Sequence, residues 1–158
     1  MGKLHQAQWL NYLIVLSSLF ILGLLVLIYW WPQSRLAQAR NAQRWTTVQK
    51  LLVVTVGYWQ NNQQQLPVGI TPVARLLGTA ANCQVACGSA GQTMTNCLDL
   101  KGILESEFLT TPLIDPATSQ WSEERTGYAI NFIDGRLKVF ACGAELGEEI
   151  SISRQLIE

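Results

Sequence analysis

The sequence has little of what enzyme catalysis requires. It contains one histidine, His5, and it has no acidic residue before Asp99. A serine or cysteine nucleophile needs a base, usually a histidine, within hydrogen-bond distance, and the C-terminal part of the chain has none. The later carboxylates, such as Glu123 and Glu124, lie near turns and are more typical of a solvated acidic surface than of a paired acid–base site. We therefore expect a protein that is not an enzyme.

Charged residues are also scarce, at 14% of the chain, and their net charge of zero conceals an asymmetry. All 11 acidic residues lie at or after Asp99. The basic residues before that point are Lys3, Arg35, Arg40, Arg44, Lys50 and Arg75. The asymmetry predicts contact between the basic and acidic parts, within a chain or between neighbouring copies; a solvated basic face and acidic surface is the simpler alternative. The basic residues are too sparse for a nucleic-acid site.

Residues 10–31 are predicted to form a transmembrane helix. The stretch LNYLIVLSSLFILGLLVLIYWW carries no charge and has the length of about 20 residues that crosses a bilayer. Aromatic residues at its two ends are typical of the membrane–water interfaces: Trp9, Tyr12, Tyr29, Trp30 and Trp31. A cleaved signal peptide would have a shorter apolar core and a small-residue cleavage site. We expect a retained anchor in the lipid bilayer, preceded by a short tail, residues 1–9.

Two features predict opposite orientations for this anchor. The positive-inside rule weighs Lys3 before the span against Arg35, Arg40 and Arg44 after it, and alone places the C-terminal part in the cytoplasm. Four cysteines in a small domain favour an oxidising compartment instead. We give the cysteines more weight. The expectation is a single-pass protein with a cytoplasmic N-terminus and an extracytoplasmic or cell-surface head.

Residues 32–65 are predicted to form an amphipathic helix that belongs to the head. Apolar or small residues recur every three or four positions: Leu36, Ala39, Ala42, Trp45, Val48, Leu52, Thr55 and Trp59. Leu66-Pro67 ends the pattern. The segment that follows has the composition of loops, with weak signals for short helices around Val73–Leu77 and over Asp99–Leu109, and turn signals at Thr111-Pro112 and Asp115-Pro116.

The C-terminal part alternates as an antiparallel sheet does. Tyr128, Ile130 and Phe132 mark one strand, and Leu137, Val139 and Ala141 mark the next. Asp134-Gly135 between them is a strong hairpin signal, and Ile150 and Ile152 suggest a third strand. Such a sheet needs a partner to bury one face. We predict an α+β fold in which Trp45, Val48, Leu52 and Trp59 of the long N-terminal helix pack against about three strands within residues 66–158.

Four cysteines, Cys83, Cys87, Cys97 and Cys142, allow a zinc site or two disulfides. Outside the cytoplasm two disulfides are favoured, and three pairings are open. We favour Cys97–Cys142 with Cys83–Cys87, because the first bridge closes the longer loop. Oxygen ligands for calcium are present at Asp115, Ser119, Glu123 and Asp134, but without the spacing of a calcium loop. No metal or cofactor is predicted.

Three stretches of the chain together resemble the type IV pilin and type II secretion pseudopilin family. The first runs from Ala39–Arg44 through Tyr58–Asn62 to Leu66-Pro67; the second comprises Cys97–Leu100, Leu109, Pro112 and Ile114–Pro116; the third comprises Thr126–Ile130, Asp134–Arg136, Val139–Cys142 and Glu145. Members of the family begin with a basic leader that ends in glycine, and carry a glutamate at the fifth mature position. Here Gly2-Lys3-Leu4-His5 is no such leader and no glutamate precedes Glu105. We expect an atypical member that is not processed as a standard prepilin.

The resemblance implies a non-enzymatic structural or assembly subunit of a type IV pilus, a pseudopilus or a related secretion or DNA-uptake filament system. Its partners would be other pilin-like subunits or further copies of itself, bound through helix packing, together with the assembly machinery. Ser17, Ser18 and Gly23 offer close approach between helices. The alternative is a membrane-tethered extracytoplasmic binding domain that does not enter a filament.

Overall fold

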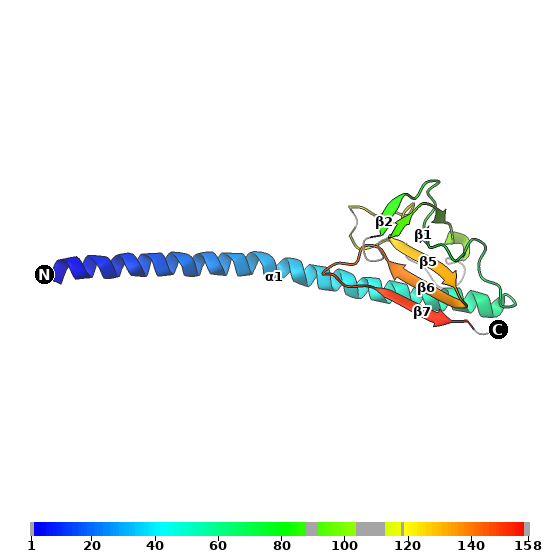
Figure 1. Ribbon diagram of the computed structural model, residues 1–158, viewed down its shortest axis with the longest axis horizontal. Helices are drawn as coiled ribbons and strands as arrows, with labels where there is room; N and C mark the ends of the chain where they lie inside the picture. The colour runs from blue at the N-terminus through cyan, green and yellow to red at the C-terminus, as the bar shows by residue number, and fades with distance from the viewer. Residues whose placement is uncertain (1, 88–91, 104–112, 118, 157–158) are drawn as a thin grey trace. The chain divides into compact units, whose positions relative to one another are not determined.

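The computed structural model describes residues 2–87, 92–103, 113–117 and 119–156. The chain divides into two compact units, Met1–Ala37 and Gln38–Glu158, which we call the anchor and the head. One helix, α1 (Gly2–Asn61), contributes to both units (Figure 1). All the strands belong to the head.

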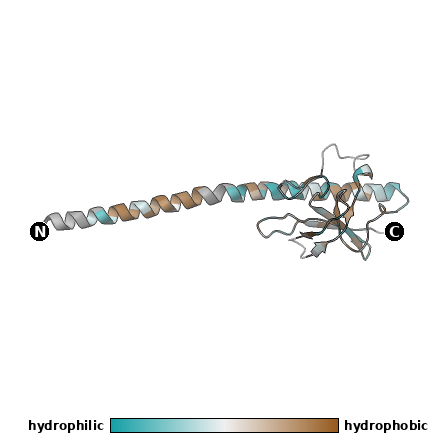
Figure 2. Cartoon of the chain, turned by 90° about the horizontal axis from the view of Figure 1, so that it is seen from above, coloured by the Kyte–Doolittle hydropathy of each residue, from teal (hydrophilic) through white to brown (hydrophobic). Residues whose placement is uncertain are grey.

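The anchor contains an apolar helical stretch whose side chains over residues 11–28 are exposed. It is long and apolar enough to cross a membrane, and none of its apolar window is buried against other parts of the structure. Figure 2 shows this apolar stretch in brown. Trp9 and Tyr12 are exposed, whereas the side chains of Tyr29, Trp30 and Trp31 lie outside the described part. Exposed apolar surface of this extent is unfavourable in water.

In the head, α1 presents a buried face that differs from the predicted one at its start. Its buried positions are Asn41, Arg44, Val48, Leu51, Leu52, Val54, Thr55 and Val56. Leu36, Ala39 and Ala42, which the apolar spacing placed on this face, are exposed instead. The buried face of α1 is polar in its first turns. Asn41 and Arg44 lie there and bind a carbonyl and a carboxyl group of the head. From Val48 onward the prediction and the structure agree.

The helix ends at Asn61, slightly before the predicted end near Gln65. Gln63 and Gln64 adopt left-handed backbone conformations, with φ of 53° and 61°. The Gln64 N–H donates to the Trp59 carbonyl at 3.0 Å. This left-handed cap satisfies carbonyl groups at the helix end, so the helix stops before Leu66-Pro67 is reached.

The head contains a five-stranded sheet in the order β4-β1-β5-β6-β7 and a separate two-stranded hairpin, β2-β3. The sheet strands are β1 (Arg75–Leu77), β4 (Cys97–Leu98), β5 (Tyr128–Ile133), β6 (Arg136–Ala141) and β7 (Ser151–Gln155); the hairpin strands are β2 (Val85–Cys87) and β3 (Gln92–Met94). Among the described strand pairs, only β1–β4 is parallel. The predicted α+β architecture is confirmed, and β5, β6 and β7 are the three strands read from the sequence.

The sheet is wider than predicted, because β1 and β4 come from the segment read as loop. β1 replaces the short helix suggested around Val73–Leu77. Of the helix suggested over Asp99–Leu109, residues 99 and 100 are not helical and residues 101–103 are. Residues 104–109 lie outside the described residues, as does Thr111-Pro112. The hairpin turn at Asp134-Gly135 is confirmed: both residues have positive φ, 51° and 74°, as a two-residue type I′ turn requires.

The sheet separates two apolar clusters. On one face, Val48, Leu52, Tyr128 and Ile130 are buried in one core with Leu137 and Val139, and Trp45, Trp59 and Phe132 are half-buried against it. The predicted packing of the α1 face on β5 is therefore confirmed, and Figure 1 shows the head part of α1 passing behind β6 and β7. On the other face, Leu76, Met94, Trp121 and Phe140 cluster with Cys83, Cys87 and Cys142. We call the elements over this second face, β2, β3 and residues 114–117 and 119–121, the cover.

Candidate functional site

The most elaborate polar site of the head joins α1 to the loops beside the sheet. We call it the ionic cluster; its members are Arg40, Asn41, Arg44, Asp115, Glu145 and Glu148. At its centre Arg44 and Asp115 form a two-pronged ion pair, with Nε–Oδ2 at 2.6 Å and Nη2–Oδ1 at 2.7 Å. Both side chains are fully buried. A two-pronged pair fixes orientation as well as distance, so it locks α1 in register with the loop before β5.

Glu145, in the loop between β6 and β7, completes the cluster. Its carboxylate accepts hydrogen bonds from Arg40 Nε at 2.7 Å and from Arg44 Nη1 at 2.9 Å. Asn41 adds a reciprocal pair with the backbone of the same residue: its Nδ2 donates to the Glu145 carbonyl at 2.9 Å, and its Oδ1 accepts from the Glu145 N–H at 3.1 Å. Arg40, Asn41 and Arg44, within little more than one turn of α1, thus hold one loop by side chain and backbone.

Electrostatics in the cluster follow from these contacts. Hydrogen bonds from Arg40 foremost, and then from Arg44, lower the pKa of Glu145 to about 2, although burial opposes the shift. Burial would lower the pKa of Arg44, but its hydrogen bonds to Asp115 and Glu145 outweigh that effect and raise it. The Arg44 and Glu145 side chains therefore stay charged near neutral pH. This suits the cluster to fastening the helix.

The charge asymmetry of the sequence has its explanation here. Arg40 and Arg44 of the basic part bind Asp115 and Glu145 of the acidic part within one chain. Of the oxygen groups considered for calcium, Asp115 is already bound by Arg44 and by the Ala117 N–H, at 2.9 Å. Contact between neighbouring copies remains a prediction.

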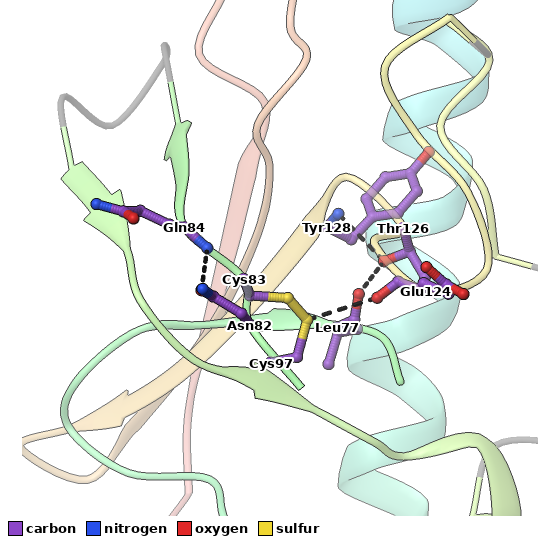
Figure 3. The surroundings of a disulfide bond; sticks show 8 residues. All are labelled: Leu77, Asn82, Cys83, Gln84, Cys97, Glu124, Thr126 and Tyr128. Carbon is purple, nitrogen blue, oxygen red and sulfur yellow. Dashed lines mark hydrogen bonds between the residues drawn. A yellow bond between two sulfur atoms is a disulfide. The ribbon is translucent and has the colours of Figure 1, made fainter. Parts of the chain in front are cut away.

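All four cysteines form disulfides, but the favoured pairing is wrong. Cys83 pairs with Cys97 and Cys87 pairs with Cys142, with sequence separations of 14 and 55. Cys83 and Cys87 do not face each other, because Cys87 lies in β2 and its buried side chain packs over the outer face of the sheet towards Cys142. Cys83 lies just before the hairpin and reaches β4, where Cys97 begins the strand (Figure 3).

The two bridges hold the cover at both ends. Cys83–Cys97 joins the base of the β2–β3 hairpin to the sheet edge, and Cys87–Cys142 joins β2 to the residue after β6. Beside the first bridge, Thr126 Oγ1 donates to the Leu77 carbonyl at 2.8 Å (Figure 3). Three residues of each hairpin strand lie in the described part, and a two-stranded hairpin is only marginally stable by itself. The disulfides supply the missing constraint.

The chain matches no protein-family model, and neither a curated protein nor a solved structure is similar to it. The family resemblance therefore depends on the residues quoted from the sequence.

Sequence reasoning found the cysteines and the helix–sheet packing but missed the ionic cluster. A signal was present: Asn41 and Arg44 continue the three- and four-residue spacing of Val48, Leu51 and Thr55 toward the N-terminus. Polar residues on the buried face of a helix indicate buried partners, since unpaired charges are costly there. The acidic partners, from 71 to 107 positions away, carry no local pattern that marks them.

Proposed function

We propose that the protein is a non-enzymatic, pilin-like subunit of a type IV pilus, a pseudopilus or a related secretion or DNA-uptake filament system. One observation carries the proposal: the single helix α1 is apolar and exposed in the anchor, and in the head its continuation packs under an antiparallel sheet. Such a helix serves both as a membrane anchor before assembly and as a packing element afterwards. The order of the quoted motifs along the chain supports the same proposal.

The proposed orientation places the N-terminus in the cytoplasm and the head outside. The two disulfides of the head support it, because disulfides persist in oxidising compartments. Two of the three cations counted after the span, Arg40 and Arg44, are paired with carboxylates in the head. The folded protein therefore does not present them as a free basic flank.

Helix packing in this chain would have to proceed without a charged residue in the span. Ser17 and Ser18 donate their hydroxyl protons to the carbonyls of Ile14 and Val15, at 2.9 and 2.8 Å, so these groups are satisfied within the helix. Contacts between copies would then come from apolar side chains and from close approach at Gly23, where no atom lies within 4 Å of an added Cβ in the described structure.

A photo-crosslinking amino acid at Val53 tests the proposal. Val53 lies on α1 with 64% of its surface exposed, so a crosslinker there reaches a neighbouring copy without disturbing the core. In cells that carry the assembly machinery, illumination is expected to give a ladder of crosslinked copies, and surface shear fractions should contain filaments labelled by antibody to the head. The same variant dispersed in detergent is the control and should stay monomeric.

If illumination in cells gives only the monomer and the shear fractions hold no labelled filament, the subunit proposal is wrong. That result would favour the alternative, a membrane-tethered extracytoplasmic binding domain.

A further inference from the structure

A shallow cleft of about 290 Å³ lies where α1 ends and the chain turns toward β1. Its lining residues are Tyr58, Asn61, Asn62, Gln63, Gln65, Leu66 and Val68. Four of these carry a primary amide, one is aromatic, two are aliphatic, and none is charged. The composition is unusual for a helix end, where lysine or arginine often meets the exposed carbonyls.

The backbone at the cleft is held in a costly conformation. Gln63 and Gln64 are consecutive non-glycine residues with positive φ. Glycine adopts this region freely, whereas a residue with a Cβ is disfavoured there by roughly 1 kcal/mol or more. Glutamine also lacks the local side-chain contact that makes asparagine tolerable in this region. A glycine would adopt the same backbone conformation without this strain.

The amides of the cleft have hydrogen-bonding capacity to spare. Asn62 uses its Nδ2 to donate to the Tyr58 carbonyl at 2.8 Å, which leaves its Oδ1 as an acceptor. Within the described part of the chain, the side chains of Asn61, Gln63 and Gln65 have no hydrogen-bond partner. Each primary amide offers two donors and an acceptor side by side. A hydroxyl group likewise donates and accepts, so a row of amides matches a row of hydroxyls.

We propose that this cleft binds a neutral carbohydrate, a short stretch of an uncharged polysaccharide or glycan. A charged ligand would lose hydration without meeting an opposite charge, since no Asp, Glu, His, Lys or Arg lines the cleft. Tyr58, Leu66 and Val68 provide the apolar and aromatic surface against which the C–H face of a sugar ring packs. The volume is at the lower end of ligand pockets, which suits one or two sugar units.

This binding site is independent of the proposed filament function, because a head that binds sugar does so in a monomer or in an assembly. The test uses the full chain in micelles of a detergent whose headgroup contains no sugar. The probes are neutral oligosaccharides, chitotetraose and maltotetraose, and anionic ones, a sialylated and a sulfated tetrasaccharide. Saturation-transfer NMR detects binding, and titration gives the affinity. At least one neutral probe is expected to bind, and the anionic probes are not.

The backbone strain supplies a matched pair of variants. Gln63→Gly removes a lining side chain and Gln64→Gly removes a neighbour that does not line the cleft; both relieve a positive φ, so neither should unfold the head. Gln63→Gly should weaken binding of the neutral probe about tenfold, the effect of losing one or two hydrogen bonds. Gln64→Gly should leave the affinity unchanged.

Three results would overturn the proposal: no probe binds, only an anionic probe binds, or the two variants affect binding of the neutral probe equally. None of these results bears on filament assembly, which the crosslinking experiment at Val53 measures separately.

Discussion

Arg44 of α1 and Asp115, in the loop before β5, form a fully buried, two-pronged ion pair across 71 positions of sequence. Neither residue retains contact with solvent. Taking two charges out of water is costly, and the pair recovers that cost only with good geometry and further hydrogen bonds. Both conditions hold, because Asn41 accepts from Arg44 Nη1 at 2.7 Å and the Ala117 N–H donates to Asp115. Breaking this pair should therefore be among the most destabilising single changes in the head.

Arg44→Ala should lower the free energy of unfolding of the head by roughly 3–5 kcal/mol, because Asp115 is left buried without a partner. Arg40→Ala is the matched control. Arg40 and Glu145 retain 32% and 30% of their side-chain exposure, so this pair contributes at most about 1 kcal/mol. Urea denaturation of the full chain in detergent, followed by tryptophan fluorescence, measures both. Equal losses for the two variants would contradict the central role of Arg44.

Glu145 should give the head a distinct acid sensitivity. Its pKa is lowered from 4.5 to about 2 in the folded protein, so the folded state favours the ionised form. The stability that this group contributes is complete above pH 4.5 and is lost as the pH falls toward 2. Wild type should therefore lose its advantage over Glu145→Gln across that range.

Thermal or urea unfolding at several pH values checks this expectation. Glu123→Gln is the control: Glu123 lies 3.6 Å from Lys101, and both side chains are mostly exposed. Its pH profile should parallel that of wild type. A constant difference between wild type and Glu145→Gln from pH 6 to pH 2 would show that the Arg40 and Arg44 contacts do not hold the carboxylate ionised.

The two disulfides should differ in their contribution to stability. In the chain-entropy description, closing 55 residues stabilises by roughly 4 kcal/mol and closing 14 by roughly 3 kcal/mol. Replacing Cys87 and Cys142 together with serine should thus cost more than replacing Cys83 and Cys97. Each double replacement leaves the other bridge intact and no free thiol, which prevents exchange.

Non-reducing digestion and mass spectrometry should find the peptide containing Cys83 linked to that containing Cys97. Reduction should add four hydrogens to the intact mass, since two bridges open. A linkage between Cys83 and Cys87, or four free thiols in the native protein, would refute the pairing.

How far the sequence predicted this structure depended on whether a signal was local. The Asp134-Gly135 turn and the alternation of β5 and β6 depend on neighbouring residues, and they were found. The cysteine pairing was not, because it depends on where β2 lies over the sheet, which no spacing reveals. β1 and β4 were missed because three- and two-residue strands are too short to alternate visibly. In the ionic cluster, the residues on α1 carried a local spacing signal, and their acidic partners carried none.

Adjacent valines on α1 test the packing of the helix against the sheet. Val54 is 4% exposed within the core cluster, and Val53 is 64% exposed. Both Val→Ala changes alter helix propensity alike, so their difference isolates burial. Val54→Ala should cost about 2 kcal/mol through lost apolar contact and a small cavity. Val53→Ala should stay within about 0.5 kcal/mol of wild type. Reversed effects would mean that the opposite face of α1 packs on the sheet.

The last prediction concerns the side of the membrane on which the head lies. The basic residues after the span predict the cytoplasm, and the cysteines predict the outside. The cations act during membrane insertion, when the chain is unfolded. The positive-inside rule then weighs Arg35, Arg40 and Arg44 against Lys3. The disulfides report on the compartment in which the head resides after folding. In a reducing cytoplasm both bridges would be reduced. By chain entropy the free energy of unfolding of the head would then fall by roughly 7 kcal/mol, about the stability of a typical domain.

We therefore expect the head outside. A membrane-impermeant protease added to intact cells, or to spheroplasts where an outer membrane is present, should remove the head while a cytoplasmic marker survives. Blocking thiols before lysis gives an independent readout, because an oxidised head contains no cysteine to modify. If the head survives until lysis and all four cysteines take up the blocking reagent, the orientation follows the charges rather than the cysteines. The head would then fold by its core and ionic cluster alone, and the double Cys→Ser variants would be as stable as wild type in cells.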